Sequence, residues 1–213
     1  MGKLVVIEGI DGSGKSTQMR LLTERLENDG TEFTTVAFPR YAEPSSELIK
    51  MYLGGEFGTN PNDVNAYAAS SFFAVDRFAS YKREPWGSFY DNGGLVLMDR
   101  YTTSNAVHQG AKLSATERAE FFRWLYDFEF RLIGLPKPDV VLYMDISAKQ
   151  ALLRISARAE TQDIHEKNSE YMAMCVESSR QAAQLLGWTA IDASRGEAEI
   201  HEQITALVKE VIS

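Results

Sequence analysis

Short runs of consecutive apolar residues alternate along the chain with longer stretches in which apolar residues recur every three or four positions. A short continuous apolar run is typical of a strand that is covered on both faces, as in a parallel sheet. Five such runs lie at residues 4–7, 33–38, 95–98, 140–144 and 189–191. Because the stretches between them have helical spacing, the pattern predicts an α/β domain with a five-stranded parallel sheet flanked by helices.

Helix boundary signals mark several of the stretches between the predicted strands. Ser114 with Glu117, and Ser147 with Gln150, have the spacing of a capping box, which predicts a helix start at each place. Glycines stop other helices because they adopt the left-handed backbone conformation without strain. The predicted helices lie at residues 15–28, after Ser114, after Ser147, before Gly187 and at residues 198–212.

The longest helical pattern begins near Val64 and reaches about residue 84, just before Pro85. Apolar side chains that repeat at helical spacing normally form the buried face of a helix. The predicted buried face consists of Val64, Tyr67, Ala68, Phe72, Val75, Phe78 and Ala79.

The charged residues limit the kinds of partner that this chain can have. It contains 22 Lys and Arg against 30 Asp and Glu, for a net charge of −8. A chain this acidic lacks the uniform positive field of a nonspecific nucleic-acid or membrane-surface binder, so any bound anion must meet locally placed cations. Cys175 is the only cysteine and no apolar run is long enough to span a bilayer, which predicts a soluble cytoplasmic protein. No repeat or linker divides the chain, which predicts one domain over residues 1–213.

A complete phosphate-binding loop pattern, G-x-x-x-x-G-K-[ST], follows the first predicted strand and opens the first predicted helix. Backbone N–H groups of such a loop surround an anion, the lysine bridges the β and γ phosphates, and the following hydroxyl binds Mg²⁺. The residues of the pattern are Gly9, Ile10, Asp11, Gly12, Ser13, Gly14, Lys15 and Ser16. The sequence therefore predicts a site for a nucleoside triphosphate, with Lys15 and Ser16 on its phosphates and metal.

The end of the third predicted strand carries Asp99-Arg100-Tyr101. An acidic residue at this edge of a parallel sheet can hold Mg²⁺, and the adjacent arginine can face a second phosphate. Taken alone, Asp99 and Arg100 are also compatible with an ion pair on the surface. The guanine-reading N-K-x-D of small GTPases and the L-S-G-G-Q of transporters are both absent from the sequence.

Together these motifs resemble the thymidylate kinase family of nucleoside monophosphate kinases, over nearly the whole length. The resemblance implies a P-loop kinase architecture of three layers, with the polar stretch at about 154–168 as a short lid that closes over ATP. The motifs that carry it are Ile7-Glu8-Gly9-x-Asp11-Gly12-x-Gly14-Lys15-Ser16-Thr17, Phe38-Pro39, Phe73 with Arg77, Asp99-Arg100-Tyr101 with Ser104 and Asn105, Pro136-Lys137-Pro138-Asp139, and Asp163-x-x-Glu166.

The resemblance implies a binding site for thymidine monophosphate. It implies that Phe73 stacks on thymine, that Asp11 binds the 3′-hydroxyl and that Arg100 approaches the 5′-phosphate. Phe73 and Arg77 lie four residues apart and thus on one helix face, although without the resemblance Phe73 in the core and Arg77 in solvent is the simpler interpretation. Arg40 directly follows Pro39, one residue earlier than in many family members, which leaves its reach to the phosphate open. The implied substrate-binding residues are Asp11, Phe38, Pro39, Arg40, Phe73, Arg77, Arg100, Ser104, Asn105 and Gln109.

On the ATP side, the family that the chain resembles uses an arginine for the transferring phosphoryl group, which comes from the loop in one subgroup and from the lid in another. This loop carries no arginine, so the resemblance implies that the cation comes from elsewhere. Arg154 and Arg158, one helical turn apart, are the candidates, beside the alternative that they form an ordinary exposed face. Ser179 stands where many family members place a tyrosine against the sugar, and Tyr171 is a candidate substitute. The implied ATP-binding residues are those of the loop with Thr17, Ser194 and Arg195, and the implied Mg²⁺ ligands are Ser16 and Asp99.

The expected function is transfer of the γ-phosphoryl group of Mg²⁺-ATP to thymidine monophosphate, a step toward thymidine triphosphate, by a homodimer as is usual in the family. One alternative is a kinase that acts on a free deoxynucleoside, for which Glu8 is a candidate base, or on another monophosphate. Another alternative, from a different class, is a protein that senses ATP as a switch without rapid turnover. Phe72 and the segment 121–124 are candidate positions for the dimer interface.

Overall fold

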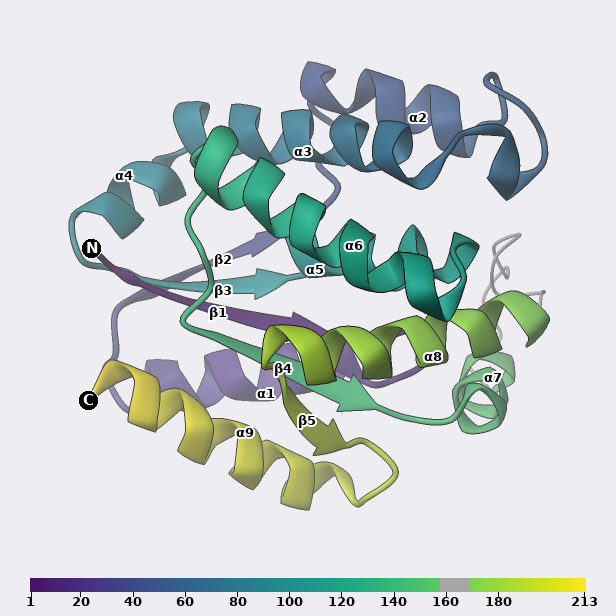
Figure 1. Ribbon diagram of the computed structural model, residues 1–213. Helices are drawn as coiled ribbons and strands as arrows, with labels where there is room; N and C mark the ends of the chain where they lie inside the picture. The colour runs from purple at the N-terminus through teal and green to yellow at the C-terminus, as the bar shows by residue number, and fades with distance from the viewer. Residues whose placement is uncertain (158–168) are drawn as a thin grey trace.

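A five-stranded parallel sheet forms the centre of the molecule in the computed structural model, which describes residues 1–157 and 169–213 (Figure 1). Its strand order is β2-β3-β1-β4-β5, and all neighbouring strands pair in parallel. The strands are β1 (Lys3–Glu8), β2 (Phe33–Ala37), β3 (Leu95–Asp99), β4 (Val140–Asp145) and β5 (Thr189–Asp192). All five predicted strands are confirmed, together with the parallel sheet.

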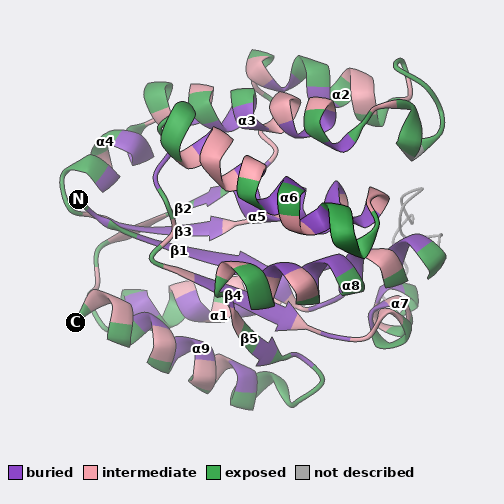
Figure 2. Cartoon of the chain, viewed as in Figure 1, coloured by how far each residue is buried: buried purple, intermediate pink, exposed green. Residues whose placement is uncertain are grey.

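Helices cover both faces of the sheet and give the molecule three layers. Figure 1 shows α1 (Lys15–Asn28) and α9 (Glu197–Ile212) on one side, in contact with each other. The helices on the other side are α3 (Ala66–Arg83), α5 (Thr102–His108), α6 (Ala115–Tyr126) and α8 (Ser169–Leu186). Residues 4–7 of β1 are fully buried between these layers, as the continuous apolar run predicts (Figure 2).

Both predicted capping boxes lie at helix starts. Ser114 and Glu117 form the reciprocal pair at the start of α6, and the Ser147 side chain accepts from the Gln150 backbone at the start of α7 (Ala148–Ser156). Beyond α6 the chain continues as a π-helical segment, Asp127–Leu132. Single turns of 3-10 helix lie at Pro44–Ser46, Pro61–Asp63 and Gly110–Lys112.

Three short helices were not predicted from the sequence: α2 (Glu47–Leu53), α4 (Pro85–Asp91) and α5. Pro85 ends the predicted long helix, but it is also the first residue of α4, where a proline is tolerated because its missing N–H has no partner to lose. α5 directly follows β3, so its residues lie at the carboxyl edge of the sheet.

The predicted buried face of α3 is wrong. Val75 is 50% exposed and Phe78 is 39% exposed, and Tyr67 is also partly in solvent. The buried positions are instead mostly small or polar: Ala66, Ala69, Ser70, Ala74, Asp76, Arg77 and Ser80. The helix packs with its polar face inward because the charges of Asp76 and Arg77 are satisfied there by partners from other segments.

Nothing in the described ranges resembles a membrane span: none of their helices is both long enough and apolar enough to cross a bilayer.

Candidate functional site

The phosphate-binding loop turns sharply between β1 and α1. Gly12 and Gly14 have positive φ angles of 78° and 98°, a conformation that side chains with a Cβ rarely adopt. A Cβ on Gly12 would also lie 2.5 Å from the carbonyl oxygen of Ala151, so α7 packs directly on the loop. The Ser13 hydroxyl is buried and has no hydrogen-bond partner among the described residues. The loop therefore has the conformation that the sequence pattern predicts.

Lys15 is buried at the start of α1, with its ammonium group inside the loop. Its Nζ donates to the carbonyl oxygen of Ile10 at 2.9 Å and lies 3.9 Å from an Asp11 carboxylate oxygen. Burial, and secondarily the positive charge of Arg100, lower the pKa of Lys15 to about 8. A desolvated ammonium that is only partly neutralised by carboxylates is suited to receive a polyphosphate.

The two predicted metal ligands, Ser16 and Asp99, lie beside the loop, on α1 and on β3. Ser16 is exposed in the first turn of α1, and Asp99 ends β3, next to β1 in the sheet. One Asp99 oxygen is buried without a hydrogen-bond partner in the described structure. A hydroxyl and one carboxylate fit Mg²⁺, which usually keeps several waters and binds one or two protein groups together with phosphates.

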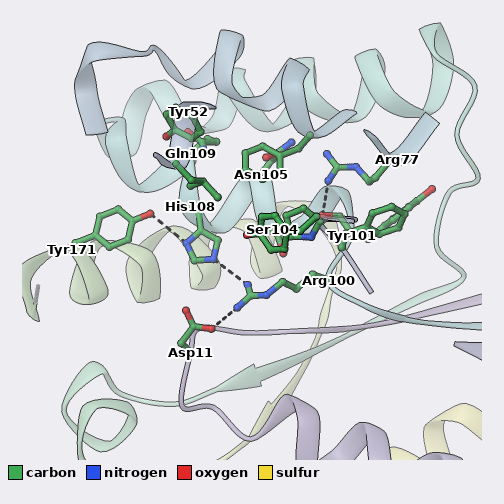
Figure 3. Close-up of a pocket in the computed structure, with 15 residues that line it drawn as sticks. Asp11, Tyr52, Arg77, Arg100, Tyr101, Ser104, Asn105, His108, Gln109 and Tyr171 are labelled. Atoms are coloured by element: carbon green, nitrogen blue, oxygen red, sulfur yellow. Dashed lines mark hydrogen bonds and ion pairs between the residues drawn. The ribbon is translucent and has the colours of Figure 1, made fainter. Parts of the chain in front are cut away.

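Arg100 joins the loop to the neighbouring cavity. It adopts a positive φ of 66°, rare for a residue other than glycine, which turns its side chain back across the end of β1. Its guanidinium pairs with Asp11, lies 3.9 Å from Glu8 and donates to Nε2 of His108 at 3.1 Å (Figure 3). These contacts hold a permanent cation at the mouth of the loop.

Glu8, at the end of β1, links the loop to the start of α5 through hydrogen bonds. It is fully buried, and it accepts hydrogen bonds from the hydroxyls of Thr103 and Ser104 at 2.7 Å and 2.6 Å and from the backbone of Gly9 at 2.8 Å. With its oxygens occupied in this way, Glu8 fixes the start of α5 against the loop. This arrangement gives Glu8 a structural role and places Ser104 at the cavity wall.

A cavity opens beside Arg100 and contains most of the predicted substrate-binding residues. Its wall combines aromatic side chains with a few polar groups, which is the usual composition of a site for a small aromatic ligand. The predicted residues that line it are Asp11, Phe38, Pro39, Phe73, Arg77, Arg100, Ser104, Asn105 and Gln109. The peptide bond between Phe38 and Pro39 is cis.

Arg77 lies in the cavity wall as half of a buried ion pair. It is 2% exposed, and it donates to both carboxylate oxygens of Glu129, which is fully buried, at 2.8 Å and 2.6 Å. Thr102 and Asn105 also donate to Glu129. The prediction that Phe73 and Arg77 face one ligand site is compatible with this wall, whereas the alternative of a solvated Arg77 is wrong.

Asn105 and Gln109 place amide groups in the cavity wall, and these two amides differ in their hydrogen bonds. Asn105 Nδ2 donates to the carbonyl oxygen of Ser70 at 3.2 Å, which fixes the orientation of the amide. The Gln109 side chain is buried, and its Oε1 has no partner among the described residues. Gln109 therefore offers an acceptor to a ligand that carries an N–H group.

Arg40 does not line this cavity. Its guanidinium pairs with Glu84 at 2.7 Å, and its backbone N–H donates to Asp76 at 2.9 Å. The next residue, Tyr41, lines the cavity instead. Arg40 therefore pairs with Glu84 and does not join the other predicted substrate-binding residues in the lining of this cavity.

A second cavity lies on the other side of the loop. Ser13, Gly14, Thr17, Arg154 and Arg195 are among the residues that line it. Arg154 donates to the carbonyl oxygens of Ser13 at 3.4 Å and Ala193 at 2.8 Å, so it is anchored over the loop. Ser194 hydrogen-bonds to Asp192. Arg158 and the rest of the predicted lid from residue 158 to 168, with Asp163 and Glu166, lie outside the described residues.

Sequence reasoning missed or left open several residues of the first cavity. Tyr52 comes from the unpredicted helix α2, and His108 ends the unpredicted α5. Tyr171 lines the cavity, whereas Ser179 is buried and donates to the carbonyl oxygen of Cys175. Tyr171, whose role the sequence left open, therefore lies in the wall of this cavity. His108 lies seven residues after Tyr101, and no local pattern in the sequence signalled its place in the cavity.

Comparisons with known proteins agree with these geometric features. Residues 7–204 match a family model described as "Thymidylate kinase". The thymidylate kinase of Mycobacterium tuberculosis is 33% identical over 174 residues, which are 78% of this chain and 79% of that protein. A probable thymidylate kinase of Pyrobaculum aerophilum is 31% identical and covers 98% of this chain and 97% of its own length. The human thymidylate kinase is 27% identical over 99% of this chain and 92% of its own length.

Proposed function

Because this chain belongs to the thymidylate kinase family, we propose that its two cavities bind thymidine monophosphate and ATP on either side of one phosphate-binding loop. The chain is an ATP-dependent phosphotransferase that converts thymidine monophosphate to the diphosphate. The observation that carries the arrangement is the division of the loop between the cavities: Asp11 lines one, and Ser13 with Gly14 lines the other. A donor and an acceptor phosphate that share such a loop can approach each other in line.

On the donor side, the backbone of the loop and Lys15 bind the β and γ phosphates of ATP. Ser16 and Asp99 would hold Mg²⁺, which would neutralise part of the phosphate charge when it is bound. Arg154, anchored over Ser13, provides a cation for the transferring group, and Arg158 is the second candidate for that role. Ser194 and Arg195, in the turn after β5, are proposed to contact the purine.

On the acceptor side, Arg100 binds the 5′-phosphate and Asp11 the deoxyribose 3′-hydroxyl. Phe73 stacks on thymine, while Arg77, Asn105 and Gln109 meet the edge of the base. The unpartnered acceptor of Gln109 and the fixed amide of Asn105 support pairing with the N–H and carbonyl groups of that edge.

The attacking group needs no general base in this reaction. The second pKa of a phosphate monoester is about 6, so the acceptor is already largely ionised at neutral pH. What the protein supplies is positioning and neutralisation of charge, by Lys15, Arg100 and Arg154. Glu8, whose oxygens accept three hydrogen bonds within the protein, is poorly placed to serve as the base that a deoxynucleoside kinase requires.

A coupled assay of ADP release tests the function with a panel of acceptors: thymidine, thymidine monophosphate, deoxyuridine monophosphate and cytidine monophosphate. We expect the highest kcat/KM with thymidine monophosphate. Turnover with thymidine but not with its monophosphate would establish the deoxynucleoside kinase instead. ATP binding without turnover on any acceptor would favour the switch protein.

Binding of ATP is expected to take up a proton near pH 8. In the protein without ATP, Lys15 has a pKa of about 8, so roughly half of the molecules carry a neutral amine at that pH. The bound polyphosphate favours the ammonium form. Affinity for ATP should therefore fall as the pH rises above about 8. Calorimetry at pH 8 in buffers of different ionisation enthalpy measures the uptake. Lys15→Arg, which stays protonated, should remove most of the buffer dependence; an unchanged dependence in this variant would assign the proton elsewhere.

We also propose that the chain forms a homodimer through α3. Val75 and Phe78 are apolar and exposed on this helix, whereas Phe121 and Phe122, in the segment considered from the sequence, are fully buried and unavailable to a partner. Light scattering should give twice the chain mass of 23.9 kDa. Val75→Asp with Phe78→Asp should give a monomer, while Leu185→Asp, at an exposed position of α8, should not. A monomeric wild-type protein at micromolar concentration would refute the dimer.

Cytoplasmic location stays a prediction.

A further inference from the structure

His108 connects the guanidinium of Arg100 to helix α8. Its Nε2 lies 3.1 Å from Nη1 of Arg100, and its Nδ1 lies 3.3 Å from the hydroxyl of Tyr171. Sγ of Cys175, one turn further along α8, lies 3.7 Å from the same Nδ1. In Figure 3 the chain of contacts runs from Asp11 through Arg100 and His108 to Tyr171.

The contact with Arg100 determines the protonation state of the imidazole. A guanidinium has only donors, so Nε2 of His108 must be an acceptor, and the neutral ring then carries its proton on Nδ1. Nδ1–H in turn donates to the Tyr171 hydroxyl. Burial, and to a smaller extent the Asp11 carboxylate, raise the pKa of Tyr171 well above its ordinary value and that of Cys175 to about 12, so both groups are neutral beside the imidazole at neutral pH.

The orientation of the Arg100 guanidinium depends on which acceptor opposes its attraction to two nearby carboxylates. Asp11 pairs with Nη2, and Glu8 lies 3.9 Å from Nη1. Asp11 and His108 both line the cavity, whereas Glu8 is fully buried outside this lining, and Nη1 faces both Glu8 and the acceptor on His108. Without this acceptor, electrostatic attraction favours rotation of the guanidinium toward Glu8 and away from the cavity.

We propose that His108, as the neutral Nδ1–H tautomer fixed by Tyr171, is a positioning residue that holds Arg100 at the acceptor phosphate. The effect on turnover rests on the proposed function of Arg100, whereas the tautomer and the contact with Arg100 do not. Tyr171 thereby acts on Arg100 through the imidazole in addition to lining the cavity.

Nitrogen NMR of protein labelled in histidine tests the tautomer directly. The chain has three histidines, and His108→Gln and His201→Gln identify two of the signals. We expect His108 at pH 7.5 to be neutral and protonated on Nδ1. An Nε2–H tautomer or an imidazolium would overturn the proposal, whether or not the chain phosphorylates thymidine monophosphate.

Kinetics test the effect on Arg100. His108→Leu removes the acceptor, and loss of a hydrogen bond to a charged group should raise the KM for thymidine monophosphate about 10- to 100-fold. The KM for ATP should change little, because Lys15 and the loop backbone remain. His108→Gln, which keeps an acceptor, should recover most of the loss, and His201→Gln on α9 is the control. Equal loss in the Leu and Gln variants with unchanged melting temperatures, or no loss in Leu, would refute the positioning role.

Discussion

Arg100→Met should reduce kcat/KM for thymidine monophosphate by about 10³-fold or more, the largest loss that we expect from a single substitution. An arginine that neutralises charge on a transferring phosphoryl group or its acceptor contributes roughly 10³ to 10⁵ in rate. Arg100 is the cation that borders both the loop and the acceptor cavity, and its pairing with Asp11 fixes it there. Steady-state kinetics with each substrate varied in turn measures the effect.

Two further variants make this experiment specific. Arg100→Lys keeps the charge but loses the planar fork that binds a phosphate and His108 together, so it should recover only a small part of the activity. Arg25→Met removes an exposed arginine that pairs with Asp29 on α1, and it should leave the kinetics unchanged. An Arg100→Met enzyme within tenfold of wild type would place the phosphate-binding cation elsewhere.

Arg77→Met should lower the free energy of unfolding by about 3–5 kcal/mol, because it leaves the Glu129 carboxylate buried and unpaired. The same substitution removes a donor from the cavity wall and should weaken binding of thymidine monophosphate. Chemical denaturation monitored by circular dichroism measures the stability, and equilibrium binding of the nucleotide measures the second effect.

The double variant Arg77→Met with Glu129→Gln separates the two effects. It removes the uncompensated charge, so it should recover much of the lost stability without restoring nucleotide binding. If the single and the double variants are equally destabilised, the ion pair does not account for the loss. If the double variant binds the nucleotide like wild type, Arg77 does not contact it.

The parts of the site that depend on local sequence could be predicted. Gly12, Gly14 and Lys15 belong to one loop whose spacing determines its backbone, and Asp99 and Arg100 directly follow a strand. Parallel strands place their carboxyl ends at one edge, so their approach to the loop also follows from the predicted sheet.

The parts that depend on distant partners could not be predicted. Glu129 lies 52 residues from Arg77, and no local pattern marks it as the carboxylate that allows an arginine to be buried on α3. Without that partner, hydrophobic periodicity assigns Val75 and Phe78 to the core, and the structure exposes both. Arg40 likewise forms an ion pair with Glu84, and the residues next to Arg40 in the sequence do not indicate this partner.

A crystal structure of the protein with thymidine monophosphate, Mg²⁺ and a non-hydrolysable ATP analogue would test the central claim most directly. The account predicts the acceptor phosphate within hydrogen-bond distance of Arg100 and the triphosphate around Ser13, Gly14 and Lys15, with the two phosphates facing each other beside Asp11. Thymidine monophosphate bound away from Arg100, or both nucleotides on the same side of the loop, would contradict it.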